Sequence, residues 1–213
     1  MAAALAINCL LLTIFAVQHS VMARPWFKRW WTQMVPWSIE RSTYVLFASL
    51  ALDLLFWQWR PLGGTVWSID TPWLRVAVWG LFAYGWLQVL VITFYIDHFD
   101  LFGLRQVWLH LLGRQYTRVQ FVTPTPYRLV RHPLYLGFML AFWAAPTMSM
   151  TRLVFAAATT AYILIAIQFE ENDLAHEHGA AYADYRRRTP MLVPGLGRRE
   201  PTASGIASPS ASR

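Results

Sequence analysis

The chain has 213 residues, of which 56% are hydrophobic and 14% charged, with a formal net charge of +7. This composition is typical of a membrane protein rather than of a soluble globular domain. Its single cysteine, Cys9, excludes an intramolecular disulfide and a cysteine-ligated zinc or iron–sulfur centre. The basic residues lie in the loops and form no separate strip, so we do not expect the protein to bind nucleic acid.

Five apolar stretches alternate with polar loops along the chain. They cover residues 2–23, 42–59, 76–96, 132–151 and 153–169. Each is close to the ~18–20 residues that an α-helix needs to cross a ~30 Å hydrocarbon layer. We therefore predict an all-α integral membrane protein with five transmembrane helices, which form a single domain over residues 1–194. Residues 195–213, rich in Ser, Ala and Pro, are predicted to be a disordered tail.

The distribution of Lys and Arg predicts the orientation in the membrane. Fifteen of these 18 residues lie in segments 23–41, 97–131 and 170–213, which fall on one side. The other three lie on the opposite side. The positive-inside rule then places the N-terminus outside and the C-terminus in the cytoplasm. Segments 97–131 and 170–194 also hold most of the acidic residues, so we expect any chemistry at the cytoplasmic face.

The sharpest local motif is Arg-His-Pro-Leu-Tyr-Leu-Gly at residues 131–137. Proline is favoured in the first turn of a helix, so we expect Pro133 to begin the fourth transmembrane helix. The fourth and fifth helices are nearly equal in length, which brings His132 and Tyr135 to the same depth as Glu170 and Glu171. Residues 172–188 follow with a helical spacing of apolar residues. They predict an amphipathic helix that lies on the membrane surface and closes over this hairpin.

The motif at 131–137 is one of three that follow in order, the others being Glu170-Glu171 and Gly179-x-x-Tyr182-x-x-Tyr185. The set resembles the isoprenylcysteine carboxyl methyltransferase superfamily of integral-membrane methyltransferases, and it covers roughly residues 121–194. The block at 97–108 and the segment Gln18-His19-Ser20 look like the methanethiol S-methyltransferase branch, related to NnrU-type proteins. With these motifs the resemblance extends over nearly the whole chain.

The resemblance implies that the fourth and fifth helices and the C-terminal segment bind S-adenosylmethionine. Its methyl group would pass to a small thiol, methanethiol, to give dimethyl sulfide, in a bacterial inner membrane. Arg131 or the first N–H groups of the fourth helix suit the methionine carboxylate. Glu170 or Glu171 suits the ribose hydroxyls or the amino group, and aromatic rings attract the sulfonium cation. The candidate cofactor-binding residues are Tyr127, Arg131, His132, Pro133, Tyr135, Gly137, Glu170, Glu171 and Tyr182.

No Gly-x-Gly-x-x-Gly loop is present, so the Rossmann mode of binding this cofactor is excluded. A thiol reacts as its thiolate, which requires a proton acceptor. The candidates are His98, with Asp97 or Asp100 to orient it, His19 at the end of the first helix, and Tyr135. A nearby sulfonium would also lower the pKa of the thiol and make a dedicated base unnecessary. The spacing Asp-His-x-Asp is poor for metal ligands, and we expect no metal.

Several alternatives stay open at this point. In one alternative, Asp97 and Asp100 serve only to end the third helix. The same fold can methylate a prenylcysteine carboxylate or a phospholipid amine, and a related hairpin occurs in sterol-reductase-like proteins that use NADPH and have more spans. A non-enzymatic membrane protein, such as a transporter subunit or an assembly factor, would not need His132, Glu170 and Tyr182 together.

Overall fold

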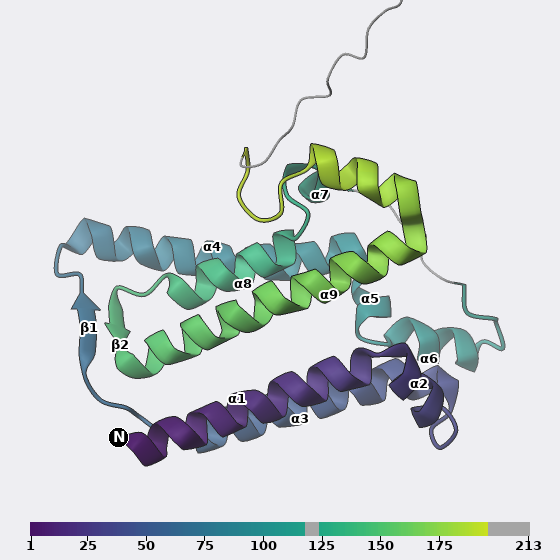
Figure 1. Cartoon of the computed structure of the whole chain (residues 1–213), viewed down its shortest axis with the longest axis horizontal. Helices are drawn as coiled ribbons and strands as arrows, with labels where there is room; N and C mark the ends of the chain where they lie inside the picture. The colour runs from purple at the N-terminus through teal and green to yellow at the C-terminus, as the bar shows by residue number, and fades with distance from the viewer. Residues whose placement is uncertain (118–123, 196–213) are drawn as a thin grey trace, which may run out of the picture.

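The computed structural model describes residues 1–117 and 124–195 and is mainly helical (Figure 1). The predicted disordered tail therefore lies, except for Gly195, outside the described residues. The elements are α1 (Ala2–Ala23), α2 (Pro25–Trp31), η1 (Trp37–Ile39), α3 (Glu40–Gln58), β1 (Thr65–Ser68), α4 (Pro72–Ile96), α5 (His98–Leu101), α6 (Leu104–Leu111), α7 (Thr125–Leu129), α8 (Pro133–Trp143), β2 (Thr147–Ser149) and α9 (Met150–Arg188).

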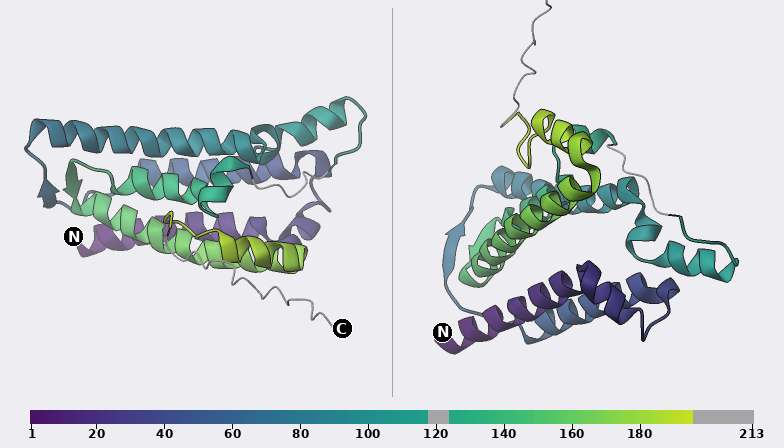
Figure 2. Two further views of the ribbon diagram at one scale, coloured as in Figure 1. Left: turned by 90° about the horizontal axis from the view of Figure 1, so that it is seen from above. Right: turned by 45° about the vertical axis from the view of Figure 1, so that its right-hand side comes forward.

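The long helices form two groups (Figures 1 and 2). The first is the pair α1 and α3, and the second contains α4, α8 and α9, with α8 packed between its two neighbours in contact with both. Strands β1 and β2 pair antiparallel, with Thr65 opposite Ser149 and Ser68 opposite Thr147. They lie at the end of the molecule away from α2, α5 and α6. The all-α prediction did not include these two strands, which join the loop after α3 to the segment after α8.

Within the described residues, α1, α4 and α9 are long and apolar enough to cross a membrane. They correspond to the first, third and fifth predicted spans, as expected of a multi-pass membrane protein. Helix α3 has 19 residues and corresponds to the second predicted span, and α8 to the fourth. The arrangement with five spans stays a prediction.

The fourth apolar stretch is not one continuous helix, in contrast to the prediction for residues 132–151. Helix α8 ends at Trp143 after 11 residues, or about 16 Å, which is half of a hydrocarbon layer. Pro146 disfavours helical backbone at the residue before it. Arg152 donates to the carbonyls of Ala141 at 3.3 Å and Ala144 at 3.1 Å. These bonds satisfy carbonyls that a helix end leaves without partners.

Close packing of α4 on α8 depends on two glycines. A Cβ atom added at Gly85 would lie 2.7 Å from the backbone nitrogen of Ala141 and 2.9 Å from the carbonyl oxygen of Gly137. A Cβ atom at Gly137 would lie 3.0 Å from the carbonyl oxygen of Gly85. Small residues let membrane helices approach closely, and here they let α4 and α8 pack backbone against backbone.

We expect Gly85→Ala to destabilise the protein, because its methyl group would meet backbone atoms that cannot move aside. Overpacking of this kind costs about 1–3 kcal/mol. The matched control is Gly80→Ala in the same helix, where an added Cβ meets nothing within 4 Å. Thermal unfolding in detergent checks the pair: a lower midpoint for Gly85→Ala alone is expected, and equal midpoints would contradict the packing argument.

Candidate functional site

A buried cluster of charged side chains lies where α8 begins and the apolar part of α9 ends. His132 and Glu171 are 4% and 3% exposed, and His132 Nε2 lies 3.0 Å from Glu171 Oε1. Arg131 Nε donates to the same oxygen at 2.7 Å, and Arg186 Nε lies 3.3 Å from Glu171 Oε2. Three side chains thus share one carboxylate. The Arg-His-Pro motif and the carboxylate pair lie together, as the hairpin argument predicts.

Opposing effects act on the pKa of Glu171. Burial raises the pKa of this carboxyl group. Hydrogen bonds from His132 and Arg131, together with their charges, lower it by more than burial raises it, and the resulting pKa is about 2. Glu171 is therefore ionised at neutral pH. Burial raises the pKa of Tyr182 to about 12, and the charge of Glu171 acts in the same direction. The Tyr182 hydroxyl therefore keeps its proton beside the carboxylate.

The end of α9 folds back over the start of α8 (Figure 1). Gly179 has a φ of +53° within α9, a conformation that favours glycine, and the helix changes direction there. Arg131 Nη1 donates to the carbonyls of Arg186 at 3.1 Å and Thr189 at 2.6 Å. Residues 172–188 are thus helical, as predicted, with a break in the helical backbone at Gly179, and their last turns cover the charged cluster.

Glu170 and Tyr135 form the more open side of this cluster. The Glu170 side chain is 45% exposed, and its Oε2 lies 3.8 Å from His132 Nδ1. The two nitrogens of the His132 ring thus have different carboxylates as neighbours. The Tyr135 ring stacks on His132 with a centroid distance of 5.6 Å, and Tyr135 is close enough to Glu170 to interact with its charge. A small molecule on this side would meet a carboxylate and an aromatic face.

Other predicted cofactor residues have structural roles. Pro133 is the first residue of α8, and its carbonyl accepts a hydrogen bond at 2.7 Å from a side chain of α4. Gly137 allows the close approach to α4. Tyr182 is 1% exposed, so its ring is enclosed by protein. The carbonyl of Tyr127 accepts a hydrogen bond at 2.7 Å from the hydroxyl of Tyr185, which ties α7 to the end of α9.

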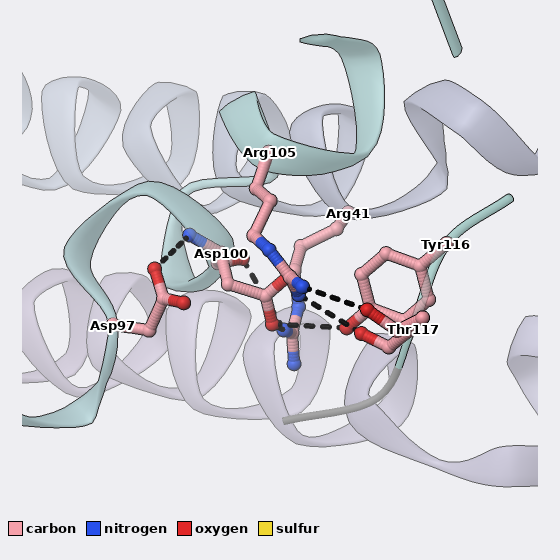
Figure 3. A network of polar contacts seen from close by, with 6 residues as sticks. All are labelled: Arg41, Asp97, Asp100, Arg105, Tyr116 and Thr117. Atoms are coloured by element: carbon pink, nitrogen blue, oxygen red, sulfur yellow. Dashed lines mark hydrogen bonds and ion pairs between the residues drawn. The ribbon is translucent and has the colours of Figure 1, made fainter. Parts of the chain in front are cut away.

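Asp100 lies at the centre of a second polar network (Figure 3). Arg41 Nη1 donates to Asp100 Oδ2 at 2.9 Å, and Arg105 Nη1 lies 3.5 Å from Oδ1. The Tyr116 hydroxyl donates to Oδ2 at 3.0 Å, and Arg105 also donates to Thr117. Figure 3 shows the two guanidinium groups converging on the carboxylate from different helices. The network connects α5 and α6 to α3.

The expected orientation of His98 by an aspartate is absent from the described hydrogen bonds. His98 Nδ1 lies 2.8 Å from the Thr93 hydroxyl, and its ring stacks on Phe94 with a centroid distance of 4.3 Å. Asp97 instead accepts from the backbone N–H of Asp100 and caps α5, with a φ of +93° where α4 ends. Asp97 thus bonds to the backbone of α5, and Asp100 pairs with Arg41 and Arg105.

His19 belongs to α1, and its side chain contacts Tyr44 of α3. The Tyr44 hydroxyl lies 3.0 Å from its Nδ1 and 2.9 Å from its Nε2. The neighbouring Ser20 hydroxyl lies 3.0 Å from the hydroxyl of Tyr162 in α9. Sequence reasoning missed Tyr44 and Tyr162. The available signal was a phenol inside an apolar stretch, where a polar group is costly and usually has a partner.

Comparison with known proteins connects this geometry to a family. The chain is 56% identical over 196 residues to a methanethiol S-methyltransferase of Crocosphaera subtropica, which covers 92% of the chain and 77% of that relative. It is also 56% identical over 191 residues to a methanethiol S-methyltransferase of Mycobacterium tuberculosis, in a match that covers 90% of the chain and 78% of that relative.

A more distant relative is Nurim of Mus musculus, which is 32% identical over 183 residues that cover 82% of the chain and 69% of that protein. No family model and no solved structure matches the chain. The high identity to the first two relatives extends over nine tenths of the sequence, which confirms the resemblance inferred from the motifs. The chain therefore belongs to the methanethiol S-methyltransferase family of membrane methyltransferases.

Proposed function

We propose that this protein transfers the methyl group of S-adenosylmethionine to methanethiol and releases dimethyl sulfide. The observation that carries the proposal is the group of His132, Tyr135 and Glu170, where the start of α8 meets α9. It occurs in a chain whose relatives at 56% identity are named for this acceptor. A site with one open carboxylate, aromatic faces and a helix N-terminus that has no side-chain cap matches the charges of the methyl donor.

The methionine part of the donor carries an ammonium and a carboxylate group. Glu170 is exposed and suits the ammonium. In the described part of the chain, the N–H groups of Leu134 and Tyr135 in the first turn of α8 have no intrahelical partner and suit the carboxylate. Arg131 was the other candidate for the carboxylate, but its Nε and Nη1 already donate to Glu171 and to backbone carbonyls. We assign Arg131, His132 and Glu171 to holding the C-terminal segment in place.

Aromatic rings complete the donor site. Tyr135 stacks beside His132, and Tyr127 is close enough to Glu170 to interact with its charge. Flat rings of this kind suit adenine and attract a sulfonium cation. When bound, the sulfonium supplies an activated methyl group. The protein aligns the acceptor with it and provides for removal of the thiol proton.

We also propose the predicted membrane arrangement for this site. Helices α3 and α8 would complete the five spans, with α8 crossing only half of the layer and the segment up to Arg152 continuing it. The N-terminus would lie outside, and the site with most of the arginines would face the cytoplasm of a bacterial cell. Methanethiol is small and apolar enough to reach the site through the membrane, and dimethyl sulfide can leave the site in the same way.

An acceptor comparison tests the proposal. Purified protein in detergent receives labelled S-adenosylmethionine together with methanethiol, a prenylcysteine analogue or phosphatidylethanolamine. We expect label in a volatile thioether and none in the other two acceptors. Label in either lipid-like acceptor would support S-adenosylmethionine as the donor but would contradict methanethiol as the acceptor. Absence of both transfer and donor binding would return the chain to a non-enzymatic role.

A further inference from the structure

A second set of polar side chains lies between the two helix groups and has no part in the donor site. His19 in α1 and Tyr44 in α3 form its first pair, with the Tyr44 hydroxyl 2.9–3.0 Å from both ring nitrogens. Phe15 stacks on the His19 ring at a centroid distance of 5.3 Å. The pair is half-buried. The imidazole is thus held by one phenol and one apolar ring.

Ser20 and Tyr162 connect this pair to the other helix group. Their hydroxyls lie 3.0 Å apart, and the Tyr162 ring meets Phe15 edge-on at 6.3 Å. Tyr44 and Tyr162 are also close enough to Tyr135 to interact with it. Polar groups from α1, α3 and α9 thus meet between the two helix groups.

These groups are costly in helices that are otherwise apolar. An ionisable side chain such as His19 is rare within a membrane-spanning helix and is usually functional there. Among the described residues, neither His19 nor Tyr44 hydrogen bonds to a carboxylate or a guanidinium, so no ion pair explains their presence.

We propose that the acceptor thiol binds beside Tyr44 and Tyr162, between the two helix groups, and loses its proton through Tyr44 to His19. This inference rests on the proposed thiol methylation. The Tyr44 oxygen takes the proton from the thiol as its own proton passes to a nitrogen of His19. The acceptor sulfur forms its bond to the methyl carbon as the sulfonium–methyl bond breaks. The products are a thioether, S-adenosylhomocysteine and protonated His19, which returns the proton to water.

Thiols of graded acidity test this proton path. The probes are methanethiol, ethanethiol and 2,2,2-trifluoroethanethiol, whose fluorines make it a much stronger acid. Removal of a general base slows a reaction by about 10²–10⁴-fold. We expect Tyr44→Phe and His19→Ala to lose at least about 100-fold of the rate with methanethiol and ethanethiol, but less than about 10-fold with trifluoroethanethiol. An acidic thiol is already ionised and needs no base.

Two further readouts separate a proton path from a structural role. Donor affinity by titration calorimetry and the thermal unfolding midpoint should both match wild type in Tyr44→Phe. His110→Ala, at an exposed histidine of α6, is the matched control and should retain full activity with every thiol.

An equal loss with all three thiols would overturn the inference and leave the proposed function in place. The same holds if the dependence on thiol acidity appears in His98→Ala instead. A wild-type protein that methylates none of the thiols would overturn both the proposed function and the inference.

Discussion

Glu171→Ala is expected to be the most destabilising single substitution at the site. It would leave Arg131, 10% exposed in its side chain, and His132 without the carboxylate that they share. Removing one partner from a buried ion pair costs about 3–5 kcal/mol. Glu170→Ala is the control, because the neighbouring carboxylate is exposed and should change stability by less than about 0.5 kcal/mol. Unfolding in detergent measures both, and equal stabilities would contradict the assigned roles.

The same contacts predict how stability depends on pH. The pKa of Glu171 is about 2 in the folded protein and 4.5 as an ordinary carboxyl. Because the pKa is lower in the folded protein, the ionised group contributes its full stabilisation at pH values above the unfolded pKa of 4.5. This contribution is lost as the pH falls from about 4.5 to about 2. Wild type should therefore lose stability across this range more steeply than Glu171→Gln. Parallel curves for the two proteins would exclude Glu171 as the source of the acid sensitivity.

Glu170→Gln is expected to have the largest effect on donor binding among variants that keep the fold. If Glu170 holds the ammonium of the donor, its replacement removes a charge-assisted hydrogen bond worth about 1.5–3 kcal/mol. Affinity for S-adenosylmethionine should then fall by about 10–100-fold with an unchanged unfolding midpoint. Titration calorimetry measures the affinity directly.

Asp70→Asn is the matched control for Glu170→Gln, because Asp70 is an exposed carboxylate at the β1 end of the molecule. It should bind the donor as wild type does. Donor affinity that is unaffected by Glu170→Gln would remove Glu170 from the site and move the search for the ammonium ligand to other groups at the start of α8.

The core of the site could be predicted from local rules. The spacing along the chain predicted that His132 lies next to Glu170 and Glu171, and it does, although the first of the two legs is helical over only 11 residues. Proline at the first turn identified where α8 begins. These arguments need only the spacing along the chain, and the ordered motifs around Tyr182 then indicated the family.

The remaining features depend on contacts between distant segments. Helix α8 ends at Trp143 because Pro146 follows and because Arg152 reaches back to its carbonyls, and the second contact has no local signature. The pairing of Asp100 with Arg41 joins residues 59 positions apart. For this reason spacing alone suggested the wrong partners for His98 and gave no sign of Tyr44 beside His19.

The most direct test of the central claim uses S-adenosylmethionine with a deuterated methyl group. Purified protein receives this donor and unlabelled methanethiol, and the headspace gas is analysed by mass spectrometry. Thiol methylation predicts dimethyl sulfide that carries one deuterated and one ordinary methyl group, formed in proportion to S-adenosylhomocysteine. Folded, donor-binding protein that yields no such thioether would contradict the assignment of methanethiol as the acceptor.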